Sequence, residues 1–389
     1  MKRIFANIKF RIKYARKSLL GRWNFYRLNA GLYGQKQKLL VVRLDGIGDY
    51  ILFRNFFSSL KKQRAYKMVS ITLLGNIAFK DLAESFDRHF IDEFIWMDPA
   101  LLYQEKSGLF LETQRKIKSK NFTIIINPVH SRTLKVDEFI SGLGGRLVLG
   151  SVGDSINYSS PNEYQIGSRK YDFLIPVMGP QHFELYRNQD FFQKLTRSEC
   201  KPELNLSLSK EQVPDKNKVV IFPGAGHKSR QWSPQNFASL INHLNEYKKP
   251  PLNFVLCGSA ADKEICTKIL KEVTNPANVV DLSGNTSLEK LATIISSAQL
   301  LVSNETSAVH IAAATKTPAV CISNGNHFGR FNPYPKEVFD KIVTVYPDNV
   351  FYNKDEYDFA VKQNKLCSSY DINSIKIEQV YQSISRLIN

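Results

Sequence analysis

Cysteine is scarce in this 389-residue chain, and no group of cysteines suits a cross-link or a metal site. The five cysteines are widely spaced, none forms C-x-x-C, and their number is odd. This spacing argues against a disulfide framework and against a zinc site. It favours reduced thiols in a cytosolic protein.

Long hydrophobic runs are also missing, although 43% of the residues are hydrophobic and 23% are charged. No stretch reaches the roughly 18–20 apolar residues of a membrane-spanning helix. A charge interrupts the N-terminal segment every few positions, which argues against a secretory signal. The composition excludes a disordered or fibrous chain, and the length predicts two domains. We therefore expect a cytoplasmic protein.

Acidic residues are absent from the first 38 positions, which hold eleven Lys and Arg. The formal net charge is +17, so the other 351 residues carry only 17 − 11 = +6. Apolar residues recur at helical spacing in this arm, at Ile4, Ile8, Ile12, Ala15 and Leu19. A basic amphipathic helix of this kind, predicted within residues 1–37, suits an anionic membrane surface. The alternative is a basic helix that packs on the folded protein.

From Lys38 onward, apolar strands alternate with helical segments in two series. Such alternation predicts two Rossmann-like α/β domains with parallel sheets and helices on both faces. The predicted strands are 38–44, 68–74, 122–127 and 146–150 in the first series, and 218–224, 253–258, 279–284, 299–304 and 318–323 in the second. The predicted helices are 49–62, 234–247, 262–272, 287–297, 307–315 and 372–388, and the linker lies within 198–216.

Ligands of such sheets bind beyond the carboxyl ends of the strands, so the turns there are the candidate sites. The first turn follows strand 38–44 and contains Gly46, Gly48 and Asp49. The glycines permit a tight turn, and Asp49 would stand at the start of a helix. A simple helix cap explains Asp49 equally well at this point. The full G-x-G-x-x-G of a dinucleotide site is lacking.

The second turn follows strand 218–224 and is rich in glycine and positive charge. Gly224 precedes Lys228 and Arg230, and Ser233-Pro234 is a typical helix start. Backbone amides with two cations suit a phosphate or diphosphate. An ordinary surface loop is the alternative.

The third turn follows strand 299–304 and contains Glu305, Thr306 and Ser307, with His310 one helical turn later. The two hydroxyls and the helix N-terminus predict an anion site. Glu305 would repel phosphate and is better suited to sugar or ribose hydroxyls. A lone histidine such as His310 is more often structural than catalytic.

These turns, in this order, resemble glycosyltransferase family 9, the ADP-heptose:lipopolysaccharide heptosyltransferases. The resemblance runs from about Lys38 to the end and includes an H-E-x-x-R-N helix with one extra residue inserted, at His182, Glu184, Arg187 and Asn188. It implies a GT-B architecture in which two Rossmann-like domains face each other across a cleft and a last helix returns to the N-terminal domain. The implied domains are 38–200 for the acceptor and 217–350 for the nucleotide sugar, with arm 1–37, linker 201–216 and a C-terminal loop and helix 351–389.

The resemblance also implies roles for the three turns. Asp49 matches the catalytic aspartate, Arg230 with its neighbour Lys228 matches the phosphate-binding cation, and Glu305, Thr306 and Ser307 match the donor-binding segment. Gly46, Gly48, Gly224 and His310 would support these residues. Glu305 and Ser307 depart from the family, which usually has Asp and Gly there, so the identity of the donor sugar is left open.

The implied reaction is an inverting transfer in which Asp49 is the general base and fixed cations stabilise the leaving diphosphate. No D-x-D triplet occurs in the chain, so we expect neither a metal nor another cofactor. The expected partners are a nucleotide-sugar donor such as ADP-heptose, a phosphorylated glycolipid acceptor of the lipopolysaccharide core, and an anionic membrane surface contacted through residues 1–37. The protein would then lie on the inner face of the cytoplasmic membrane.

Four other functions compete with this interpretation. A nucleic-acid-binding protein agrees with the pI near 9.5, but the charge is confined to one arm and no recognised motif is present, so no nucleic-acid partner is expected. A nicotinamide-dependent oxidoreductase lacks its fingerprint. A related transferase with a different nucleotide sugar is the strongest rival, because the fold does not fix the sugar. An inactive relative is disfavoured by the presence of Asp49 and Arg230.

Overall fold

A computed structural model describes residues 19–28, 37–179, 182–208, 215–247, 251–350 and 368–388. The chain divides into two compact units. The first unit comprises Met1–Pro180 and Leu185–Pro202, and the second comprises Gln181–Glu184 and Glu203–Asn389. The sequence placed the boundary at linker 201–216, whereas residues 181–184 and 203–208 belong to the second unit. One physical reason is that Leu204 and Leu206 are buried and the Leu206 amide donates to the Ala314 carbonyl.

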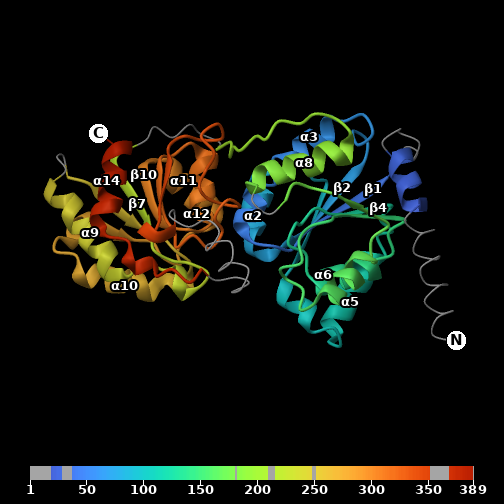
Figure 1. The fold of residues 1–389 in the computed structure, drawn as a ribbon, viewed down its shortest axis with the longest axis horizontal. Coiled ribbons are helices and arrows are strands. Elements are labelled where there is room, and N and C mark those ends of the chain that lie inside the picture. Colours follow the sequence, from blue (N-terminus) through green and yellow to red (C-terminus); the bar gives the residue numbers. More distant parts are fainter. Residues whose placement is uncertain are drawn as a thin grey trace. The chain divides into compact units, whose positions relative to one another are not determined.

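The first unit is built on a six-stranded parallel sheet in the order β3-β2-β1-β4-β5-β6. This order is that of a Rossmann-like doubly wound sheet. Its strands are β1 Lys38–Arg43, β2 Ser70–Asn76, β3 Glu93–Met97, β4 Ile124–Asn127, β5 Leu147–Ser151 and β6 Phe173–Ile175. The strands are nearly continuous in apolar residues because helices cover both faces of the sheet (Figure 1).

Helices connect these strands, and several begin at a side-chain cap that the sequence supplies. Ser107 Oγ accepts from the Phe110 amide, and Ser160 Oγ accepts from the Glu163 amide ahead of Pro161. The helices are α2 Ile47–Ile51, α3 Phe56–Lys62, α4 Lys80–Phe86, α5 Gly108–Lys118, α6 Leu134–Gly142, α7 Pro161–Ser168 and α8 Glu184–Thr196, with 3₁₀ turns Ile77–Phe79 and Pro99–Tyr103.

The second unit repeats this plan with a sheet in the order β12-β11-β10-β7-β8-β9. Its strands are β7 Asp215–Phe222, β8 Asn253–Leu256, β9 Val279–Asp281, β10 Ala298–Asn304, β11 Ala319–Ile322 and β12 Ile342–Val345. Its helices are α9 Pro234–Tyr247, α10 Lys263–Glu272, α11 Leu288–Ser296, α12 Ser307–Thr315 and α14 Ile377–Leu387, with 3₁₀ turns at Lys228–Arg230, Ala260–Asp262, Pro276–Asn278, Asp348–Val350 and Ile372–Ser374. The expected pair of Rossmann-like domains with parallel sheets is confirmed.

The last helix, α14, packs within the second unit, to which it belongs, so the expected return of this helix to the N-terminal domain is wrong. Val380 and Ile384 belong to the same apolar core as Val345 of β12, and the Tyr381 ring lies against His243 of α9. The apolar face of α14 is therefore already covered within its own unit. Residues 351–367 of the expected C-terminal loop lie outside the described residues.

Helix 19–28 is the described part of the predicted basic arm; residues 1–18 and 29–36 lie outside the described residues. It packs on the edge strand β6 of the first unit. The buried Phe25 ring lies 5.0 Å from the Phe173 ring in a tilted arrangement, and Leu28 is also buried. At Gly21 any side chain would collide, because a Cβ there would lie 2.1 Å from the Asp172 carbonyl oxygen. This stretch thus packs on the protein, as the alternative interpretation expected.

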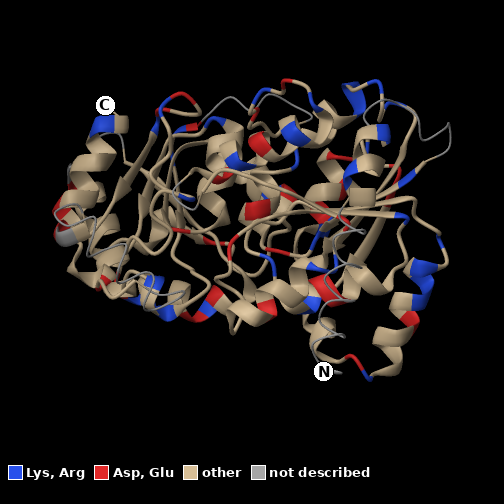
Figure 2. Ribbon diagram, turned by 45° about the vertical axis from the view of Figure 1, so that its right-hand side comes forward, with Lys and Arg blue, Asp and Glu red and all other residues tan. Residues whose placement is uncertain are grey.

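No described helix is long and apolar enough to cross a bilayer. The four described cysteines are free thiols. Burial raises the pKa of Cys257 and of Cys266 to about 12, so both are protonated and unreactive at neutral pH. Lys and Arg alternate with Asp and Glu over the helices of both units (Figure 2).

Candidate functional site

The three turns chosen from the sequence follow β1, β7 and β10, at the carboxyl ends of their sheets. The first belongs to the first unit, and the other two belong to the second. Each unit is described separately below.

Asp49 lies in the first turn of the short helix α2, which begins after Gly46. The Asp49 carboxylate bends back over Gly46, where a Cβ would lie 3.1 Å from Oδ2. The turn is fixed to β2 because Asn76 Nδ2 donates to the Asp45 carbonyl at 3.0 Å. Asp49 is half-buried at the surface of its unit. A carboxylate in this place is held in position and is accessible to a proton donor.

The core beneath Asp49 fixes the position of α2. The Tyr50 ring stacks on Phe79 at 4.1 Å and 7°. The Asn188 amide donates to the Leu52 carbonyl at 3.2 Å, which joins α8 to the end of α2. Asn188 is part of the H-E-x-x-R-N segment, so that segment supports the helix that carries Asp49. Arg187 of the same segment is buried and donates to the Gly179 carbonyl at 3.0 Å.

Arg43 ends β1 as a fully buried cation directly before the turn. Its Nη2 lies 2.8 Å from Asp45 Oδ2, and its guanidinium lies 4.4 Å from the centre of the Phe53 ring. Nε and Nη1 have no hydrogen-bond partner among the described residues. The Arg43 guanidinium therefore lies in the interior directly behind the first turn, next to the helix that carries Asp49.

In the second unit, the loop after β7 presents its two cations differently. A Cβ at Gly226 would lie 2.9 Å from Arg230 Nη2, so the guanidinium lies directly over the glycine backbone. The Arg230 charge also acts on the Glu305 carboxylate. Lys228 is exposed, and its charge acts on Glu264 of α10 instead. Of this pair, Arg230 thus acts on the turn after β10, and Lys228 acts on α10.

Trp232 is fully buried and anchors the loop. Its Nε1 donates to the Ile375 carbonyl at 3.0 Å, and its backbone amide donates to Asn304 Oδ1 at 3.1 Å. Asn304 Nδ2 donates in turn to the Pro223 carbonyl at 2.7 Å. Asn304 therefore holds both ends of the loop against β10. The predicted helix start at Ser233-Pro234 is confirmed, because Ser233 Oγ accepts from the Asn236 amide.

Gly224 is required by close packing within this loop. A Cβ there would lie 2.4 Å from Asp262 Oδ1. The Asp262 carboxylate is fixed because its Oδ2 accepts from the amide and the hydroxyl of Ser259, both at 2.7 Å. The absence of a side chain at Gly224 thus lets the Asp262 carboxylate pack against the loop.

Thr306 is the N-cap of α12, and its Oγ1 accepts from the Ala308 amide. The Ser303 hydroxyl lies 3.1 Å from the same oxygen. Ser307 is the first helical residue, and its hydroxyl makes no hydrogen bond within the described part of the chain. Thr306 therefore shapes the helix start, while Ser307 presents an available hydroxyl at the positive end of the helix dipole.

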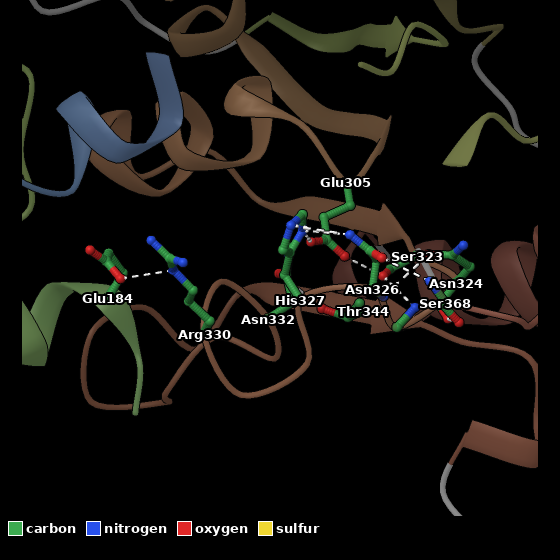
Figure 3. Close-up of polar contacts among 11 residues, drawn as sticks. Glu184, Glu305, Ser323, Asn324, Asn326, His327, Arg330, Asn332, Thr344 and Ser368 are labelled. Carbon is green, nitrogen blue, oxygen red and sulfur yellow. Dashed lines mark hydrogen bonds and ion pairs between the residues drawn. The ribbon is translucent and has the colours of Figure 1, made fainter. Parts of the chain in front are cut away.

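Glu305 is a buried carboxylate with a partner on each oxygen (Figure 3). His327 Nδ1 lies 2.9 Å from Oε1, and the Ser323 hydroxyl donates to Oε2. Burial alone would raise the pKa of Glu305, but the hydrogen bond and charge of His327, together with Ser323 and Arg230, lower it. Glu305 is thus ionised at neutral pH. Its two oxygens offer about four lone-pair positions, so capacity for further hydrogen bonds remains.

The loop after β11, which carries His327, was missed from the sequence. Its backbone is fixed by side chains: Asn324 Nδ2 donates to the Ser229 carbonyl at 3.2 Å, and Ser368 Oγ donates to the Asn324 carbonyl at 2.8 Å. The Ser368 amide donates to Asn326 Oδ1 at 2.8 Å (Figure 3). The available signal was a run of polar residues at the carboxyl end of a predicted strand, the same signal that marked the other three turns.

His310 lies inside the second unit and is 4% exposed. Its Nδ1 is hydrogen-bonded to the Tyr334 hydroxyl, and burial lowers its pKa to about 4. The imidazole is therefore neutral at physiological pH, as a structural histidine would be.

Glu184 is the first residue of α8, and the division of the chain falls directly after it, so that Glu184 is assigned to the second unit and the rest of the helix to the first. Its Oε2 accepts from Arg330 Nε at 3.0 Å, and its amide donates to the Arg330 carbonyl (Figure 3). His182 belongs to the same unit. No cluster of three or more His, Cys, Asp and Glu able to hold a metal ion occurs within the described ranges.

The second unit therefore brings Arg230, Glu305, Thr306 and Ser307 to one sheet edge with His327. A sequence model described as "Glycosyltransferase family 9 (heptosyltransferase)" matches residues 112–347, which is more than half of the chain. The chain belongs to glycosyltransferase family 9. This match includes both predicted donor turns but not Asp49.

Two curated relatives are similar to parts of this family 9 chain. The lipopolysaccharide core heptosyltransferase OpsX of Haemophilus influenzae is 26% identical over 34% of this chain and 36% of its own length. Lipopolysaccharide heptosyltransferase 3 of Escherichia coli is 22% identical over 58% of this chain and 65% of its own length. The chain thus aligns with less than two thirds of either relative.

Solved structures share the fold over most of the chain. A family 9 glycosyltransferase from Veillonella parvula superimposes with a TM-score of 0.66 at 16% identity, covering 90% of this chain and 97% of that one. E. coli heptosyltransferase WaaC with ADP-2-deoxy-2-fluoro heptose gives 0.66 at 15% identity, covering 90% and 99%. At these identities the likeness establishes the fold alone.

Proposed function

We propose that this family 9 member is an inverting, metal-independent glycosyltransferase that moves heptose from ADP-heptose onto a lipopolysaccharide core or related glycolipid. One observation carries the proposal: Arg230, lying over Gly226, and the N-terminus of α12 at Ser307 stand at the same sheet edge. A fixed guanidinium beside a helix N-terminus suits a diphosphate and would stabilise its charge as it leaves.

Asp49 would act as the general base on the acceptor hydroxyl. The Asp49 carboxylate is only half-buried, whereas the Glu305 carboxylate beside the donor turns is buried and already paired. The buried Arg43, paired with Asp45, helps to fix the turn that precedes Asp49. A positioned base contributes about 10²–10⁴-fold to the rate.

Glu305 would accept hydrogen bonds from ribose or sugar hydroxyls with its remaining lone pairs. The carboxylate does not have to be reoriented for this, because His327 and Ser323 already fix it. Lys228, directed toward Glu264, would contribute less to the diphosphate than Arg230 does.

ADP-heptose is proposed as the donor because two solved WaaC structures of the same fold contain ADP or ADP-2-deoxy-2-fluoro heptose. A thermal-shift screen against ADP-, UDP-, GDP- and dTDP-sugars tests this. We expect selective stabilisation by ADP-heptose. Arg230→Gln should weaken ADP-heptose binding about 10–100-fold, the value of one charge-assisted hydrogen bond. Lys228→Gln, which removes the same charge two residues away, should change it less than threefold. Equal losses in both variants would refute the assigned diphosphate site.

A different nucleotide sugar is the second candidate, and one observation favours it. Ser307 places a hydroxyl where the family usually has glycine, at the point where a helix N-terminus approaches the diphosphate. The additional side chain would displace the donor or bind a substituent that heptose lacks. Selective stabilisation by a UDP-, GDP- or dTDP-sugar would establish this alternative.

Metal independence, the glycolipid acceptor and the position on the inner membrane face remain part of the proposal. A relative of the same fold, TibC of E. coli, is described as an iron-containing dodecamer, with a TM-score of 0.52. Transfer by this chain should persist in excess EDTA. Removal of residues 1–37 should reduce co-sedimentation with anionic vesicles; unchanged binding would refute the role of the arm.

A further inference from the structure

A pocket of about 610 Å³ in the first unit is used by none of the functions described above. It lies at the edge strand β6, with helix 19–28 on one side and the end of α8 on the other. Phe25, Phe173 and Pro176 supply an apolar wall, and Arg22, Lys194 and Arg197 supply three cations. None of the described residues that line it is acidic.

The cations of the pocket are only partly neutralised. Lys194 Nζ pairs with Asp190 Oδ2 at 2.9 Å, but this carboxylate also accepts from the Met178 amide. The Arg197 guanidinium lies 4.0 Å from the centre of the Tyr26 ring. Stacking on a ring leaves the N–H groups at the edge of a guanidinium available to an anion. Arg22 has no partner among the described residues.

The outer face of helix 19–28 is unusually apolar. Leu19, Leu20, Trp23 and Tyr26 are 66%, 59%, 62% and 49% exposed, although Phe25 and Leu28 already fill the inner face. Four large exposed side chains in eight residues form a patch that marks an interaction surface. Tryptophan and tyrosine are the side chains that concentrate at the boundary between bilayer and water.

We propose that this pocket binds the anionic headgroup of a membrane phospholipid, while the outer face of helix 19–28 inserts among the neighbouring acyl chains. Charge complementarity and the apolar wall both favour a lipid. A free phosphate needs no apolar wall, and a nucleic acid gains nothing from outward leucines. The docking surface thus includes α8, about 170 residues away from the arm in sequence. It rests on the proposed membrane role of residues 1–37 and not on the transferase activity.

Vesicle co-sedimentation of the full chain tests the proposal. Binding to phosphatidylcholine vesicles that contain phosphatidylglycerol should exceed binding to pure phosphatidylcholine, and Arg22→Glu/Arg197→Glu should reduce it at least tenfold. The matched control is Arg115→Glu/Lys116→Glu, which reverses two exposed charges on α5 of the same unit. The control should retain binding within about threefold, since each cation near an anionic surface contributes about 1 kcal/mol only at close range. Equal losses of vesicle binding in the two double variants would overturn the proposed headgroup pocket, because general charge attraction would then explain the binding.

Two further measurements identify the occupant. Lipids brominated in their acyl chains should quench the fluorescence of the protein, and Trp23→Ser should abolish that quenching. Tyr103→Ser, at an equally exposed residue of the same unit, should not. Inorganic phosphate at millimolar concentration should not displace the vesicles; displacement would assign the pocket to a free phosphate. If Arg22→Glu/Arg197→Glu lost binding to an RNA as strongly as binding to vesicles, the proposal would also be overturned. An unchanged circular-dichroism spectrum and thermal unfolding midpoint in Arg22→Glu/Arg197→Glu would show that the variant is folded.

Discussion

The Glu305 carboxylate is ionised although it is buried, and its partners explain why. Its folded pKa lies below the ordinary value, because the interactions with His327, Ser323 and Arg230 exceed the cost of burial. A carboxylate with a depressed pKa contributes stability above its unfolded pKa and loses it as pH falls through the folded value. This contribution is therefore complete at neutral pH.

His327→Asn should remove most of that contribution. The Glu305 charge would then lack its strongest partner, so we expect the free energy of unfolding to fall by about 1–3 kcal/mol at pH 7. Urea denaturation monitored by tryptophan fluorescence measures this. Glu305→Gln/His327→Asn should recover part of the loss, because a neutral amide is cheaper to bury than an unpaired charge. Identical stability of wild type and His327→Asn would contradict the assigned pair.

His310 gives a pH dependence of the same sign, because its folded pKa also lies below the ordinary value. Its folded pKa of about 4 lies below the ordinary 6.5, so the unfolded chain binds a proton in this range and the folded chain does not. Stability should fall as pH is lowered from 6.5 to 4, by about 2 kcal/mol at pH 5. In His310→Gln the free energy of unfolding should not show this dependence on pH. It should be lower by a constant amount at every pH, because the hydrogen bond to the Tyr334 hydroxyl is disturbed. Parallel pH profiles for the two proteins would show that His310 is not a buried neutral base.

At the scale of elements, strands with strong apolar runs were predictable, whereas three of the four edge strands, β3, β6 and β12, were missed. The fourth edge strand, β9, lies within the predicted strand 279–284. The run that became β1 is buried on both faces, whereas β6 has three residues and β12 has four at sheet edges. The single helix expected at 49–62 is two, α2 and α3. Nothing in the intervening residues marks a break, because neither glycine nor proline occurs there.

The partners of Glu305 could not be predicted, because they depend on which strands are neighbours. β10 pairs with β11 in a register that places Asn304 opposite Ile322. The residues that follow each strand, Glu305 and Ser323, therefore meet, although 18 positions separate them. The sequence indicated the turns themselves, since small polar residues after an apolar run are local signals. It also indicated the cap and start of α9 for the same reason.

Helix 19–28 is held on β6 by close packing at Gly21. Gly21→Ala would place a Cβ 2.1 Å from the Asp172 carbonyl oxygen, so the helix should move away from the sheet. Limited trypsin digestion should then cleave after Arg22 and Arg27 at least several-fold faster, as mass spectrometry of the fragments would show. Gly108→Ala is the control, because no atom lies within 4 Å of its added Cβ. Equal cleavage rates in both variants would contradict the packing.

At the scale of the whole molecule, each unit carries one part of the proposed chemistry. The first supplies the base at the end of β1, and the second supplies a cation and a helix N-terminus for the diphosphate. The two units have the same strand order, so corresponding turns arise at corresponding sheet edges. The sequence indicated this duplication through its two series of strands. It misplaced α14, because an amphipathic helix does not reveal which unit covers its apolar face.

Turnover by Asp49→Asn is the most direct test of the account. The variant keeps the shape of the side chain but cannot accept the proton of the acceptor hydroxyl. The account predicts that transfer falls about 10²–10⁴-fold while stabilisation by the nucleotide-sugar donor is unchanged. Transfer at the wild-type rate would contradict it.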